Sequence, residues 1–123
     1  MNKILMFILL SIFANHSFAM GELGTKMPTV VISGEDAGKI SGEPWSSEMI
    51  KDKVFVLFYV DPDKRDENEK MEQAIGDATF DKTNFASIAV INLDATWLPN
   101  AIIESSLEGK QKQFPLVTYV KDL

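Results

Sequence analysis

Runs of apolar residues predict three strands along the chain. Val54–Val60 consists of seven consecutive apolar residues, mostly β-branched or aromatic, and Phe85–Leu93 is a second, largely apolar pattern of a buried strand. Apolar runs of this length are typical of strands that are buried on both faces of a sheet. A shorter run, Leu116–Val120, predicts a third strand. We expect the first two strands to be adjacent and central in the sheet.

Two helices are expected between these strands. Residues 63–75 contain no glycine or proline and are rich in Glu and Lys, and their sparse apolar positions place most of the first half toward solvent. Pro99 suits the first turn of a second helix, in which residues 102–107 carry an apolar stripe and Gly109 weakens the end. The order β-α-β-α-β predicts an α/β fold, with helices on both faces of a parallel or mixed central sheet.

The region before the first long strand is rich in Gly, Pro and Ser. Within it, Thr29–Ile32 is a short β-branched run, and Gly38–Ile40 suggests a turn followed by a return strand. Ser46 or Ser47 is placed to cap a short helix.

The first nineteen residues have the pattern of a secretory signal peptide. Lys3 precedes the largely apolar run Ile4–Ala14, and the small residues Ser17 and Ala19 precede the expected cleavage site. A membrane anchor is the alternative, but an eleven-residue helix spans only about 17 Å of a hydrocarbon core that is about 30 Å thick. We therefore expect a signal peptide at 1–19, a mature domain at 20–123 in the periplasm, and no stable membrane span after cleavage.

Composition excludes much chemistry. The chain has no cysteine, and its single histidine, His16, lies in the expected signal peptide. Thiol redox activity, a Ser-His-Asp triad, and zinc, haem or iron–sulfur sites built on Cys or His are therefore excluded for the mature chain, and we expect no cofactor. The 12 basic and 18 acidic residues give a net charge of −6, which repels phosphates, so nucleic acid is not an expected partner.

The entry region resembles a known superfamily. Gly24–Pro28, then Gly38-Lys39, then a buried strand is similar to the first half of the peroxiredoxin and TlpA branch of thioredoxin-like proteins. In that branch, the junction between the buried strand and the following helix carries the reactive cysteine. Here the junction is residues 59–64, and it contains no thiol.

Three stretches resemble the YtfJ family more closely: Trp45–Leu57, Val90–Ala95 and Ser105–Pro115. The resemblance implies an exported thioredoxin-like protein that lacks the redox dithiol. It also implies a later β-hairpin and C-terminal helix, which this chain lacks, so a truncated C-terminus is one alternative and Leu116–Val120 is expected at an uncovered sheet edge. The family has been labelled a group of transcriptional regulators, a role that export and negative charge argue against.

Candidate site residues are few. Asp61, Asp63, Asp66 and Glu67 are carboxylates of the type that bind Ca²⁺ or Mg²⁺, but the sixth position of an EF-hand loop would need glycine where Asp66 stands. Acidic residues that favour a helix N-terminus are the preferred explanation.

Two tryptophans and two serines are the other candidates for a functional role. Trp45 and Trp97 are candidates for partner binding or for packing at the sheet ends. Ser105 and Ser106 have no histidine to activate them, so no catalytic residue is assigned.

The expected function is therefore a binding or scaffolding module without redox or enzymatic activity. Its partner is an unknown envelope protein or a second copy of the chain. A carboxylate and divalent-metal-dependent enzyme is the alternative.

Overall fold

The computed structural model describes residues 23–123, so the signal peptide expected at 1–19 lies outside the described part of the chain. The strands are β1 (Val31–Ile32), β2 (Gly38–Lys39), β3 (Trp45–Ser46), β4 (Val54–Val60), β5 (Phe85–Asn92) and β6 (Val117–Asp122). Four of them form a sheet in the order β2-β6-β5-β4, while β1 and β3 form a separate antiparallel pair. β4, β5 and β6 are parallel and β2 is antiparallel to β6, so the sheet is mixed.

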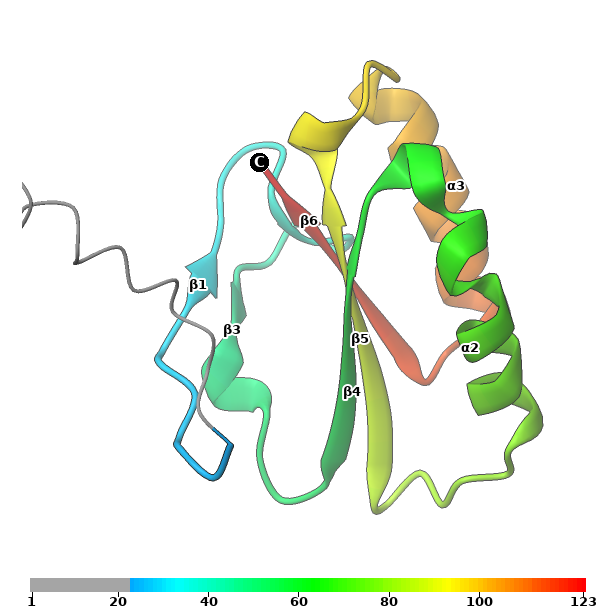
Figure 1. Ribbon diagram of the computed structural model, residues 1–123. Helices are drawn as coiled ribbons and strands as arrows, with labels where there is room; N and C mark the ends of the chain where they lie inside the picture. The colour runs from blue at the N-terminus through cyan, green and yellow to red at the C-terminus, as the bar shows by residue number, and fades with distance from the viewer. Residues whose placement is uncertain (1–22) are drawn as a thin grey trace, which may run out of the picture.

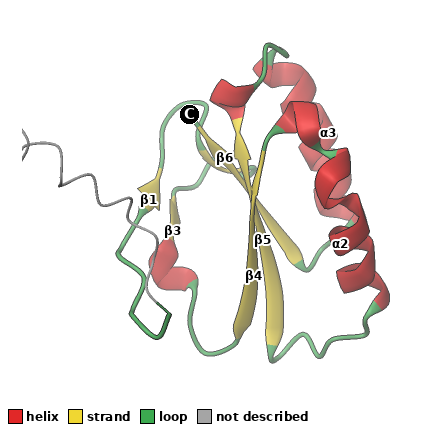
Figure 2. Ribbon diagram, viewed as in Figure 1, coloured by secondary structure: helices red, strands yellow, loops and turns green. Residues whose placement is uncertain are grey.

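The two α-helices of the described chain lie on one side of this sheet. They are α2 (Asp66–Asp77) and α3 (Asn100–Gln113), with short 3-10 turns η2 (Ser47–Met49), η3 (Pro62–Lys64) and η4 (Leu93–Ala95). Figure 1 and Figure 2 show α2 and α3 together on one side, and β1 and β3 on the other. The expectation of helices on both faces is therefore wrong. Because β4, β5 and β6 follow one another across the sheet, two right-handed crossovers in the same direction place both helices on the same face.

The most buried strand is β5 rather than β4. Residues 88–91 of β5 are 2–6% exposed, whereas Val54, Leu57 and Tyr59 of β4 are 65%, 44% and 57% exposed. The two strands are adjacent, as expected, but β4 is at the edge of the described sheet and is not buried on both faces. Trp45 and the layer around it pack over β5 and β6 and reach only Phe55 of β4, so Leu57 and Tyr59 stay exposed.

β6 is an internal strand, which corrects the expectation that Leu116–Val120 forms an uncovered edge. It lies between β2 and β5, and Tyr119 and Val120 are 6% and 0% exposed. Residue pairs such as Val90↔Val120 fix its register on β5, so its side chains alternate between the two faces. Among these residues only Leu116, just before the strand, remains exposed.

Two apolar clusters stabilise the two faces. The cluster on the helix side combines β4, β5, η4, α3 and β6, and contains Val60, Ala89, Ile91, Leu93, Ile103, Leu107 and Tyr119. The cluster on the other side consists of Trp45, Ile88, Val90 and Val120, with Ile32, Ile50 and Phe55 against it. α3 contributes Ile103 and Leu107 to the core, whereas Ile102 of the predicted stripe is 56% exposed. α3 continues through Gly109 as far as Gln113.

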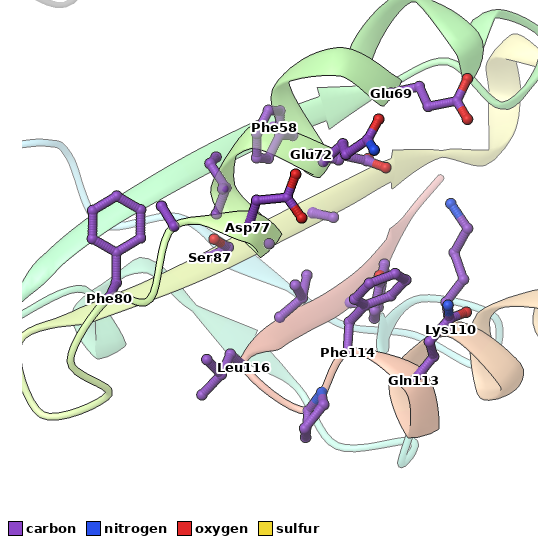
Figure 3. Close-up of a pocket in the computed structure, with 18 of the residues that line it drawn as sticks. Phe58, Glu69, Glu72, Asp77, Phe80, Ser87, Lys110, Gln113, Phe114 and Leu116 are labelled. Carbon is purple, nitrogen blue, oxygen red and sulfur yellow. The ribbon is translucent and has the colours of Figure 1, made fainter.

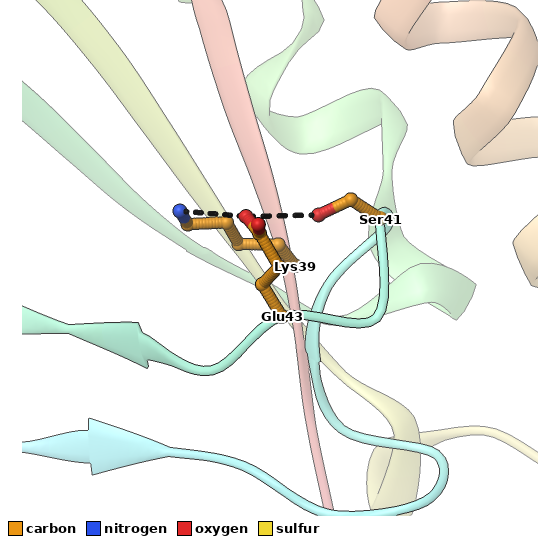
Figure 4. Close-up of polar contacts among 3 residues, drawn as sticks. All are labelled: Lys39, Ser41 and Glu43. Atoms are coloured by element: carbon orange, nitrogen blue, oxygen red, sulfur yellow. Dashed lines mark hydrogen bonds and ion pairs between the residues drawn. The ribbon is translucent and has the colours of Figure 1, made fainter.

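The loop between β2 and β3 is closed by its own polar groups (Figure 4). Lys39 N donates to the Glu43 carbonyl at 2.8 Å, and the Glu43 carboxylate accepts from Lys39 Nζ and Ser41 Oγ, each at 3.4 Å. Gly38 has a φ of +97°, and a Cβ there would lie 2.6 Å from the Glu43 carbonyl oxygen. A side chain at this position would therefore force the loop away from the sheet.

Candidate functional site

The junction after β4 is where the resemblance places a reactive group. Asp61 caps η3 by accepting from Asp63 N at 2.9 Å, and Thr96 Oγ1 donates to Asp63 Oδ1 at 2.6 Å. Tyr59 donates its hydroxyl hydrogen to Asp122 Oδ2 at 2.9 Å. Partial desolvation, then the hydrogen bond and charge of Asp122, raise the pKa of Tyr59 above its ordinary value. These contacts tie the junction to neighbouring loops.

The junction carboxylates do not converge on a common point. Within residues 23–123, no group of three or more His, Cys, Asp or Glu side chains is arranged to hold a metal ion. Asp66 instead pairs with Arg65 at 3.5 Å, and both side chains are mainly exposed. Asp66 and Glu67 lie in the first turn of α2, where negative charge favours the helix dipole.

The structure separates the remaining sequence candidates. Trp45 is 3% exposed and packs in the core, so its ring is not available to a partner. Trp97 is 83% exposed, which differs from packing at a sheet end. Ser105 and Ser106 are both exposed on α3.

A large groove opens between α2, α3 and the sheet, with a volume of about 1000 Å³. Its floor is formed by side chains of β4, β5 and β6, including Phe58, Ala89 and Tyr119. Phe80 lies at one end of the groove, and Phe114 borders it beside α3 (Figure 3). Such a volume lies at the upper end of the range of small-molecule sites.

The groove exists because α2 does not pack closely on the sheet. None of its residues is buried. Glu69, Glu72 and Gly76 are three or four positions apart and share the face that lines the groove, as Figure 3 shows for the two glutamates. Ile75 is the one apolar side chain that α2 contributes to the lining, and it is only partly buried, so the helix leaves the space above the floor open.

Negative charge dominates the α2 wall. Glu69, Glu72 and Asp77 line the groove, and none of them makes an ion pair with another described residue. Arg65 and Asp66, which pair with each other, also line this wall, while Lys110 stands on the α3 side and Lys82 follows the end of α2. Desolvation of its hydroxyl, and then the nearby charge of Glu72, raise the pKa of Tyr119 to about 12. The floor therefore lies in the negative field of the α2 wall.

Two hydroxyl groups in the floor have no hydrogen-bond partner within the described chain. Tyr119 is 6% exposed and Ser87 is 3% exposed, and both line the groove. No completely enclosed side-chain oxygen or nitrogen of residues 23–123 lacks a partner, so these two hydroxyls still reach solvent through the groove. They can donate to or accept from a molecule bound there.

Sequence reasoning missed this groove because its lining is assembled from distant segments. The one available signal was the sparse apolar content of the first helix, which predicted exposure but not a gap beneath it.

The described residues thus define a mixed α/β protein with an open, largely apolar groove between two helices. Residues 23–123 match the family described as "Bacterial protein of unknown function (YtfJ_HI0045)", and the chain belongs to this family. The suspected relationship to the YtfJ family is therefore confirmed. No curated protein and no solved structure matches the chain. No helix in the described range is long and apolar enough to cross a membrane.

Proposed function

We propose that this chain is an exported thioredoxin-like protein without redox activity, and that it holds another molecule in the groove between α2 and α3. The observation that carries the proposal is the groove itself, because open apolar floors with a few polar groups are typical of binding sites. The absence of cysteine from the whole chain supports a role in binding rather than in thiol exchange.

Export remains part of the proposal because of the residue pattern at 1–19. Signal peptidase would cleave after Ala19, so the protein isolated from the periplasm is expected to begin at Met20. N-terminal sequencing tests this expectation, and a protein that retains Met1 would contradict it.

Two glycines provide a matched test of the groove. Gly76 lines it and Gly109 does not, yet a Cβ at either position meets no atom within 4 Å. Gly76→Phe therefore fills the groove without a clash, and Gly109→Phe places the same side chain on α3 outside it. Both changes remove a helical glycine, so their intrinsic effects on helix stability are similar.

The measurement uses N-phenyl-1-naphthylamine, a neutral apolar dye that brightens in apolar surroundings. We expect the mature protein and Gly109→Phe to bind the dye, and Gly76→Phe to lose binding while retaining a cooperative thermal transition. Equal binding by both variants would show that the groove is not the binding surface. In parallel, reduction of insulin disulfides above the dithiothreitol background would contradict the non-redox assignment.

A further inference from the structure

The α2 wall of the groove and its floor make different demands on a ligand. Glu69, Glu72 and Asp77 give one wall three carboxylates that have no ion-pair partner among the described side chains. Phe58, with other apolar side chains, forms the floor below them. A ligand that satisfies both surfaces carries positive charge on the side facing α2 and apolar groups toward the sheet.

The floor also requires that the ligand supply hydrogen-bond partners for its hydroxyl groups. Ser87 and Tyr119 are both more than nine-tenths buried. Their hydroxyl groups have no hydrogen-bond partner inside the described chain. An extended peptide brings unpaired backbone N–H and C=O groups that can meet them. A helical peptide has already used these backbone groups within its own turns.

Building on the proposed function, we propose that the groove binds an extended peptide segment in which lysine or arginine alternates with bulky apolar residues. Alternate side chains of an extended backbone point in opposite directions, so one set contacts the floor and the other approaches the carboxylates of α2. Lys110 on the α3 side and Lys82 beyond the end of α2 repel positive charge, so the basic residues of the peptide face the carboxylates of α2. The acidic net charge of −6 attracts such a segment at a distance.

The probe is a fluorescein-labelled peptide of alternating leucine and lysine, and binding to the mature protein is measured by fluorescence anisotropy. We expect binding that weakens as salt is raised, because the wall carboxylates are partly solvated. Three unlabelled competitors are compared: a peptide of alternating leucine and glutamate, a peptide of alternating serine and lysine, and free spermidine. None of them is expected to displace the labelled peptide. Displacement by the leucine–glutamate peptide as strong as by unlabelled probe would refute the role of charge, and equally strong displacement by the serine–lysine peptide or spermidine would refute the apolar contribution.

The acidic wall is tested by the combined change Glu69→Gln, Glu72→Gln and Asp77→Asn. Removing three partly exposed charges that face the ligand is expected to weaken peptide binding by about tenfold. Binding of the neutral dye should be unchanged.

The matched control removes three other exposed carboxylates, Glu48→Gln, Glu67→Gln and Glu108→Gln, none of which lines the groove. It changes the net charge by the same amount, so a purely long-range effect would weaken binding equally in both variants. We expect the control to bind the peptide within about twofold of the unchanged protein. Equal weakening by both variants would overturn the assignment of the wall.

The floor hydroxyls are tested with Tyr119→Phe and Ser87→Ala. Each removes one hydroxyl and is expected to weaken peptide binding by about threefold or more, a typical effect of one lost hydrogen bond. Unchanged peptide binding by both variants would show that the backbone of the peptide does not meet the floor. Loss of dye binding and peptide binding together in Gly76→Phe supports the site. A protein that binds the dye but not the peptide refutes this inference alone, whereas one that binds neither refutes the proposed function as well.

Discussion

Lys121 is a buried charge that links β6 to α3. Its side chain is 7% exposed, and its ammonium forms an ion pair and hydrogen bond with the Glu104 carboxylate on α3. Lys121 pairs with Gly38 on one side and with Ile91 on the other, so the surrounding strands hold its backbone in place. The Glu104 side chain is 43% exposed, so only one member of the pair is fully removed from water.

This asymmetry predicts that removing Glu104 lowers the free energy of unfolding more than removing the charge of Lys121. Glu104→Ala leaves the Lys121 ammonium buried without its carboxylate, and breaking buried pairs in this way destabilises proteins by about 3–5 kcal/mol. Water can reach the space beside the half-exposed Glu104, which lowers the expected loss in the free energy of unfolding to about 2 kcal/mol. Lys121→Met instead leaves a carboxylate that solvent can hydrate, and methionine retains most of the apolar stem. Its expected loss is under about 1 kcal/mol.

Urea denaturation of the single variants and of the double variant measures these differences. The double variant strands no charge, so it should be more stable than Glu104→Ala alone. For a domain of this size, a loss of about 2 kcal/mol lowers the melting temperature by roughly 10 °C. The reasoning is refuted if Lys121→Met is the more destabilising change, or if Glu104→Ala has no measurable effect.

Other predictions concern the groove and the sheet edge. In a Tyr59→Phe background, absorbance titration should show that Glu72→Gln lowers the pKa of Tyr119 from about 12, because a negative charge above the phenol is removed; an unchanged pKa would place α2 elsewhere. The raised pKa also predicts that stability declines as pH rises from the ordinary tyrosine value toward 12, since the folded state retains the proton longer. Leu57→Asp, at an exposed position, should lower the free energy of unfolding by under about 1 kcal/mol, whereas Ile88→Asp should prevent folding. Similar denaturation midpoints for the last two variants would contradict the edge position of β4.

Local pattern was sufficient to locate most elements of the fold. The apolar runs predicted β4, β5 and β6 to within two residues at either end. The first helix followed from a stretch rich in Glu and Lys without Gly or Pro, and the second from an apolar stripe. The start of α2 differed, because Pro62–Lys64 forms a separate 3-10 turn capped by Asp61. These features depend on residues that are close together in the sequence, so the amino-acid sequence alone is enough to predict them.

The candidate site could not be predicted in the same way. Glu72 on α2, Ser87 on β5 and Tyr119 on β6 are separated by up to 47 positions, and only the crossovers bring them to one groove. The acidic residues were visible, but sequence reasoning gave attention to the junction at residues 61–67 and not to the face of α2 that lines the groove. No local pattern distinguishes a solvated helix face from one that forms the wall of a cavity.

Residue types and their spacing were enough to indicate the apolar strands, the acidic helix and the lack of a cysteine for thiol chemistry, because these features are local to the chain. The position of β4 at an edge of the described sheet and of both helices on one face emerges only from contacts between distant segments. An apolar run indicates that a strand can be buried on either face. Which strands and layers cover it depends on pairing between segments that are distant in the sequence. The groove follows from that choice, since α2 crosses a face that its own carboxylates cannot fill.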